Sequence, residues 1–163
     1  PEHPAQVAAL RAFATAVGTA PGDLATGVDG CGVVAYATSV ETMASAWALM
    51  PSLLPEISAA MRAHPVLVEG EGRLDTVLMQ TFDGATSKCG AEGLSCVSLP
   101  DGRGLAVKVL DGADRAVDPA TVGLVARLLG LEAVPEPAAK LARPPIKNDA
   151  GNDVGELLAV FPG

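Results

Sequence analysis

The sequence predicts an α+β protein in which an antiparallel sheet is flanked by helices. Three apolar, β-prone runs lie close together over residues 85–110, and the segments on either side show helical periodicity. Helices and strands are therefore grouped rather than alternating, which is typical of the α+β class. The chain has 163 residues, 49% of them apolar, and a mean hydropathy of +0.35, so we expect residues 1–163 to form a single domain with a buried core.

Helical periodicity opens the chain. Apolar residues recur at three- and four-residue steps over residues 4–17, which predicts a helix with one apolar face. Residues 21–23 break this pattern with Pro-Gly-Asp. A Gly-rich tight turn is expected at residues 28–32, and a short strand at residues 33–38.

Two serines are expected to begin the next two helices. Ser39 is suited to cap a helix over residues 40–50, and Ser52 a second helix. Proline disfavours helical backbone at the residue before it, so Pro65 should end the second helix after Ala63. The chain is then expected to continue with a short apolar run at 66–68, a loop at 70–72 and a helix at 74–80.

The sheet is predicted from three strand candidates, at residues 85–89, 94–99 and 105–110. The Pro-Asp-Gly-Arg-Gly segment at 100–104 separates the last two as a hairpin loop. Consecutive strands joined by such short loops predict an antiparallel meander.

The C-terminal part is expected to hold one helix and one strand. Asp118 followed by Pro119 predicts a helix N-terminus, and Gly130 is placed to end that helix after Leu129. Further elements are an extended Pro-rich segment at 134–145, a turn at 148–153 and a final strand at 156–161.

The charge balance excludes several classes of partner. The net charge is −8 and the isoelectric point is near 4.6, so the basic footprint of a nucleic-acid binder is missing and an anionic membrane surface is disfavoured. No apolar run reaches the length that crosses a bilayer. Three irregularly spaced cysteines predict no disulfide framework, which favours a reducing, cytoplasmic location. The Ala-rich composition, with Arg favoured over Lys, suggests a bacterial source.

The first candidate site is the turn that carries Asp29 and Cys31. A carboxylate and a thiol two residues apart can both serve as Zn²⁺ ligands, although a zinc site needs three or four. The alternative is that Asp29 caps the turn and Cys31 is a small buried apolar residue.

The second candidate site is the Lys88-Cys89-Gly90-Ala91-Glu92-Gly93 segment. A lysine at a strand end, followed by small residues, leaves room for a ligand to approach the backbone and can orient a carboxylate or take part in acid–base chemistry. It is similar to the Lys-Thr-Gly strand motif of serine β-lactamases. The alternative is a solvated lysine before a Gly-rich turn.

Other reactive arrangements are weak or missing. His64 beside Arg62 is either catalytic or a simple helix-end histidine. No serine is followed three residues later by lysine, so the chain lacks a Ser-x-x-Lys nucleophile. The Gly-Glu-Gly-Arg segment at 70–73 lacks the Lys-Ser/Thr ending of a phosphate loop, and no organic cofactor is expected.

Taken together, these motifs resemble the L-asparaginase II family, the rhizobial-type (class 3) asparaginases. Asp-Gly-Cys-Gly and Lys-x-Gly-Ala-Glu-Gly, in this order, are its specific features. The family usually has proline where Val34 stands. The matching segments are His3-Pro4 with Gln6, Gly27 to Val33, Met61-Arg62 with His64-Pro65, Gly70 to Arg73 with Asp75-Thr76, Lys88 with Gly90 to Gly93, Gly104 to Lys108 with Asp111-Gly112, Arg115-Ala116, and Asn148 to Gly155.

The resemblance implies hydrolysis of the side-chain amide of L-asparagine to L-aspartate and ammonia through a serine acyl-enzyme. It covers only the C-terminal half of the family's catalytic domain, whose fold is similar to that of the serine β-lactamases and penicillin-binding proteins. The Ser-x-x-Lys nucleophile belongs to the other half, so we expect this chain alone to be inactive.

The resemblance also implies roles for individual residues. Lys88 would be the catalytic group beside the nucleophile. Cys31 would be a Zn²⁺ ligand and Asp29 a metal or water partner, with further ligands from the N-terminal half. The substrate-binding residues implied are Gly90, Ala91, Glu92 and Arg73. The expected partners are the substrate and either a second copy of the chain or the N-terminal half.

Two further interpretations remain open. The chain could be a non-catalytic interaction domain that keeps the scaffold and binds through an exposed apolar face. It could also be a small thiol or zinc protein that uses Cys31 and Cys89. Three measurements distinguish the three interpretations: ammonia release tests the asparaginase, self-association tests the interaction domain, and zinc retention tests the thiol or zinc protein.

Overall fold

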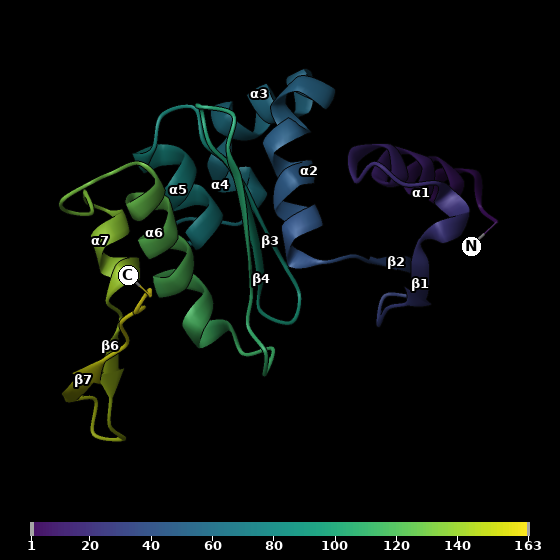
Figure 1. The fold of residues 1–163 in the computed structure, drawn as a ribbon. Helices are drawn as coiled ribbons and strands as arrows, with labels where there is room; N and C mark the ends of the chain where they lie inside the picture. Colours follow the sequence, from purple (N-terminus) through teal and green to yellow (C-terminus); the bar gives the residue numbers. More distant parts are fainter. Residues whose placement is uncertain (1, 163) are drawn as a thin grey trace.

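A three-stranded antiparallel sheet forms the centre of the molecule (Figure 1). The computed structural model describes residues 2–162 and confirms the α+β class. The strands are β3 (Thr86–Gly90), β4 (Leu94–Ser98) and β5 (Gly104–Lys108), in the order β3-β4-β5. This is the meander that the sequence predicts, with Lys88 opposite Cys96 and Cys96 opposite Ala106.

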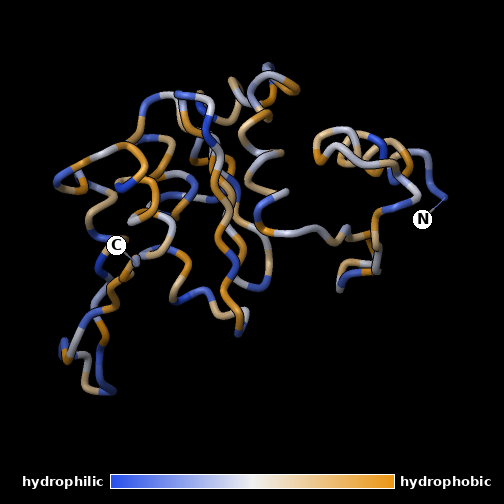
Figure 2. Tube along the Cα trace, in the orientation of Figure 1, coloured by the Kyte–Doolittle hydropathy of each residue, from blue (hydrophilic) through white to orange (hydrophobic). Residues whose placement is uncertain are grey.

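Two helices cover one face of the sheet, α5 (Leu74–Thr81) and α6 (Val117–Leu128), and α7 (Ala138–Ala142) packs against both of them. Apolar residues recur along the central strands (Figure 2), and those on this face form the main core with the helices. Leu78, Val97, Val122 and Val125 are completely buried there.

The opposite face is covered mainly by α2 (Val40–Leu53), which packs on β4 and β5. Figure 1 shows α2 beside the sheet. The helix lies very close to the sheet because Ala44 and Ala48, one turn apart, face Gly104 of β5. α3 (Pro55–Ala63) and α4 (Pro65–Val68) follow, and α3 contacts β3.

An N-terminal unit and a C-terminal hairpin complete the chain. β1 (Ala25–Val28) and β2 (Val34–Ala37) form a hairpin, and α1 (Pro4–Ala16) contacts β2, whose Val34 amide donates to Gln6 Oε1 at 3.1 Å. The rings of Phe13 and Tyr36 stack with centroids 5.1 Å apart. The remaining elements are two short 3-10 helices, Pro21–Asp23 and Asp114–Ala116, and the hairpin of β6 (Pro145–Lys147) and β7 (Asp153–Glu156).

Two predicted helix starts are wrong. α2 continues through Pro51 to Leu53, so Ser52 lies inside it and its hydroxyl donates to the Leu49 carbonyl. α3 instead begins at Pro55, whose fixed backbone angle suits a first helical turn. α6 begins at Val117, which places Asp118 inside its first turn rather than at the N-cap.

The C-terminal strand prediction is also wrong. The chain pairs as a strand over Asp153–Glu156, before the expected 156–161 segment, because the turn at 148–152 closes a hairpin with β6. The apolar run at 66–68 and part of the Pro-rich 134–145 segment form the short helices α4 and α7. Gly130 does adopt the left-handed conformation expected after α6.

None of the helices formed by residues 2–162 combines the length and the apolar character that crossing a bilayer requires.

The N-terminus of α2 gives a direct test of helix capping. Ser39 Oγ accepts from the Thr42 amide at 3.0 Å, as the sequence predicts. We expect Ser39→Ala to lower the free energy of unfolding by about 1 kcal/mol in urea denaturation, because that amide loses its acceptor. Ser45→Ala, at an exposed position in the middle of the same helix, is the matched control and should cost much less. An equal loss in both variants would contradict the capping role.

Candidate functional site

The candidate site lies where the first turn of α5 meets the edge strand β3. Asp75, in that first turn, is completely buried. Lys88 lies on β3, and its side chain is 43% exposed. The structure therefore places the lysine singled out by the sequence directly beside a carboxylate to which sequence analysis gives no site role.

Asp75 accepts three hydrogen bonds from β3. The Ser87 hydroxyl donates at 2.6 Å, the Cys89 amide at 2.8 Å and the Lys88 ammonium at 3.1 Å. The Lys88 ammonium also donates to the Cys89 carbonyl at 2.9 Å. Asp75 thus fixes Lys88 against the edge of the strand and supplies its counter-charge.

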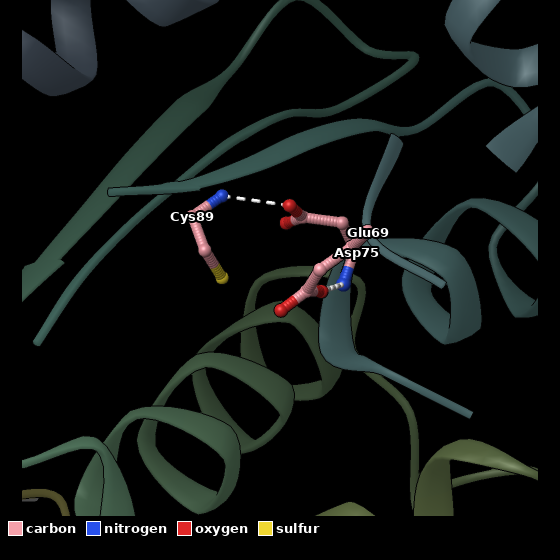
Figure 3. Close-up of side chains that lie close together, drawn as sticks. All are labelled: Glu69, Asp75 and Cys89. Atoms are coloured by element: carbon pink, nitrogen blue, oxygen red, sulfur yellow. Dashed lines mark hydrogen bonds between the residues drawn. The ribbon is translucent and has the colours of Figure 1, made fainter. Parts of the chain in front are cut away.

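The loop before α5 brings a second carboxylate to the site. Glu69 Oε2 accepts from the Asp75 amide at 2.6 Å, and Oε1 lies 3.4 Å from Arg73 Nε. Gly70 and Gly72 both have positive φ, a conformation that glycine adopts without strain, and so the loop can turn back between these contacts. Figure 3 shows the Asp75 and Glu69 carboxylates and the Cys89 thiol around a common space.

A pocket of about 140 Å³ opens beside this group. Its lining residues are Glu69, Arg73, Cys89, Gly90, Leu94, Asp114, Val117 and Asp118. Burial raises the pKa of Asp118, and the negative charges of Glu69 and Asp114 add to this rise while Arg73 opposes it. The pocket is therefore mainly acidic, with a single cationic side chain on its wall.

The two cysteines of the sheet are poor nucleophiles. Burial raises the pKa of the Cys89 thiol well above its ordinary value, and the charges of Asp75 and Glu69 raise it further. Burial is also the main cause that raises the pKa of Cys96 to about 12. Because the thiolate is the reactive form, neither side chain is suited to attack a substrate at neutral pH.

The structure brings three of the predicted site residues together. Arg73 and Gly90 line the pocket, and Lys88 lies beside it on β3. Ala91 and Glu92 lie on the exposed β3–β4 turn outside the pocket lining, where Glu92 has a φ of 61° and its carbonyl accepts from Lys108. Their role in binding substrate stays a prediction.

Asp29 and Cys31 lie on the β1–β2 turn, and both are exposed. Asp29 Oδ1 accepts from the amides of Cys31 and Val33 at 2.9 and 3.0 Å, so it caps the turn. The alternative of a buried Cys31 is wrong, because the turn projects into solvent. Two groups do not complete a zinc site, and the one cluster of three or more potential ligands among residues 2–162 is Glu69, Asp75 and Cys89.

His64 lies at the C-terminal cap of α3, in agreement with the simpler of its two interpretations. It is exposed, and its amide donates to the Ala60 carbonyl at 3.0 Å. Its neighbour Arg62 points to β3 instead and donates to the hydroxyls of Ser58 and Thr86 at 2.7 and 2.9 Å.

Sequence analysis assigned no site role to Asp75, Glu69 or Asp118. Asp75 did carry a signal, because it interrupts the otherwise uncharged segment from Leu74 to Met79, all of which is buried. A lone carboxylate at such a position needs buried donors to offset its desolvation, and so predicts a polar site.

Comparison with known proteins tests the family suggested by the motifs. A search of curated proteins gives no match. The family model described as L-asparaginase II matches residues 1–159, which is nearly the whole chain. The motifs that meet around Lys88 and Asp75 all fall within this match, and we conclude that the chain belongs to the L-asparaginase II family.

Proposed function

We propose that this chain carries the lysine-bearing half of an active site that hydrolyses the side-chain amide of L-asparagine to L-aspartate and ammonia. The observation that carries this proposal is the family match over residues 1–159. An asparaginase-type amidohydrolase also implies a small-molecule substrate. The reducing, cytoplasmic location expected from the sequence is retained in the proposal, since the three cysteines are free.

Lys88 would act as a fixed positive charge at the reacting amide. Its ammonium has three hydrogens, and two are directed to Asp75 and the Cys89 carbonyl. The third can donate to the amide oxygen as negative charge develops there, or to the attacking hydroxyl group. The 43% exposure of the side chain supports this role, because the group is accessible from outside this chain.

The charges around the pocket support a zwitterionic amino acid as substrate. Arg73 can pair with an α-carboxylate, while Glu69 and Asp118 can accept from an α-ammonium group. Gly90 has no side chain, so a ligand can approach the strand backbone. The proposed substrate-binding set also keeps Ala91 and Glu92 on the adjoining turn.

The nucleophile would come from outside this chain. We place residues 1–163 in the C-terminal half of a catalytic domain similar to the serine β-lactamases, with the Ser-x-x-Lys segment in the other half. Zinc binding by Cys31 and Asp29 would likewise need ligands from that half, since the turn itself offers two. None of the roles given to Lys88 or the pocket depends on that zinc.

Ammonia release from L-asparagine tests the proposal. We expect none from the purified chain, and turnover after addition of an N-terminal half from the same family. Lys88→Met should abolish the restored activity, because the fixed charge is lost. Lys140→Met, which removes an exposed lysine of α7, is the control and should leave it intact. Turnover by the chain alone, or full activity in Lys88→Met, would overturn the proposal.

A second candidate function is a non-catalytic interaction domain. An apolar pocket of about 580 Å³ opens between α1, β2 and the end of α2, where Leu53 and Leu54 are each 46% exposed. Such a surface suits a second copy of the chain or the missing half. Self-association in sedimentation velocity, with no activity after the N-terminal half is added, would favour this function.

A further inference from the structure

The Glu69, Asp75 and Cys89 side chains converge from two different elements. Glu69 and Asp75 flank the loop that begins α5, and Cys89 lies on β3. One potential ligand atom from each lies within 4.8 Å of the others, as Figure 3 shows. By contrast, the Asp29–Cys31 turn brings two potential ligands together.

Ser95 gives a second, independent sign of an unfilled polar site. It lies directly opposite Cys89 in β4, so both side chains project from the same face of the sheet. Its hydroxyl is completely buried and has no hydrogen-bond partner among residues 2–162, which is costly for a polar group. The Ser95 hydroxyl is therefore an unsatisfied polar group beside the Cys89 side chain.

The two carboxylates retain the capacity to bind a cation. A carboxylate has about four acceptor positions, and Asp75 uses three of them for Ser87, Lys88 and Cys89. Glu69 Oε2 accepts from the Asp75 amide, while its contact with Arg73 is longer, at 3.4 Å. Both Glu69 and Cys89 also line the 140 Å³ pocket, so a bound ion would be accessible from that side.

We propose that Glu69, Asp75 and Cys89 form a binding site for a borderline-soft divalent cation of the Zn²⁺ type. A thiolate among the ligands favours Zn²⁺ over Mg²⁺ or Ca²⁺, which prefer oxygen alone. On binding, the sulfur–metal bond replaces the S–H bond, and the proton passes to solvent. Three protein ligands leave a fourth position open toward the pocket. This site differs from the Cys31 site that the family resemblance implies, and it does not depend on amide hydrolysis.

Titration of the metal-free protein with Co²⁺ tests the site, because cobalt bound to a thiolate gives a charge-transfer absorption band. We expect one equivalent to produce the band in the unmodified chain and Zn²⁺ to displace it. Cys89→Ser should remove the band, and Glu69→Gln should weaken binding by about tenfold or more. Cys31→Ser, at an exposed cysteine, is the control and should leave the titration unchanged.

Three results would overturn the proposal: no band in the unmodified chain, a band that persists in Cys89→Ser, or a band lost in Cys31→Ser. Circular dichroism establishes that each variant is folded. If Cys89→Ser fails to fold, X-ray absorption of the zinc-loaded unmodified chain decides the question. One sulfur with oxygen neighbours supports the site, whereas two or more sulfurs, or none, contradict it.

Discussion

Asp75→Ala is expected to lower the free energy of unfolding by about 2–4 kcal/mol. The substitution leaves two donors at the buried edge of β3, the Ser87 hydroxyl and the Cys89 amide, without an acceptor. The lost ion pair with Lys88 should add little, because that ammonium is 43% exposed and solvent screens it. Asp75→Asn should cost less, since its amide oxygen still accepts. Urea denaturation followed by circular dichroism measures both.

Asp83→Ala is the control, since it makes the same substitution at an exposed aspartate just beyond the other end of α5. Its unfolding midpoint should stay close to that of the unmodified chain. If Asp75→Ala lowered the free energy of unfolding no more than Asp83→Ala, the three hydrogen bonds from β3 to Asp75 would not stabilise the fold.

Gly104→Ala should lower the free energy of unfolding at least as much as Asp75→Ala does, by about 3 kcal/mol or more. A Cβ at this position would overlap the Ala44 carbonyl oxygen and lie 2.5 Å from the Ala48 amide nitrogen. Both are backbone atoms of α2, so no side-chain rotation relieves the overlap. The helix must move off β5, which opens the packing on that face of the sheet.

Gly27→Ala provides the comparison for this substitution. Gly27 lies on β1, with open space where an added Cβ would lie. The free energy of unfolding of Gly27→Ala should therefore be unchanged or slightly raised. The same urea titration compares the two variants. A similar midpoint for Gly104→Ala would show that α2 does not pack as closely as the structure indicates.

The periodic parts of the fold could be predicted from sequence. The helix at 4–17, the helix after Ser39 and the three strands of the sheet follow directly from hydrophobic spacing and capping. The wrong predictions lie where tertiary contacts determine the backbone conformation. Pro51 is tolerated inside α2. The strand β1 is exposed along its whole length, so it has no apolar alternation from which it could be predicted.

The site could be predicted only in part, for a related reason. Lys88 and Gly90 are singled out by the strand segment that carries them and Arg73 by the family resemblance, and the fold brings them to one region. Asp75 is 13 residues away from Lys88 along the chain, and their contact depends on how α5 docks on β3. No local spacing rule predicts such a pair, nor the burial that leaves the Ser95 hydroxyl without a partner.

The contacts of Asp75 and Lys88 also limit what can attach to the sheet. β3 is an edge strand among residues 2–162, and the unpaired N–H and C=O groups of an edge are a template for adding a strand from another molecule. At Cys89 the amide is taken by Asp75 and the carbonyl by Lys88, so an incoming strand finds neither group free. The same side chains that build the candidate site therefore block intermolecular β-pairing at this point of the edge.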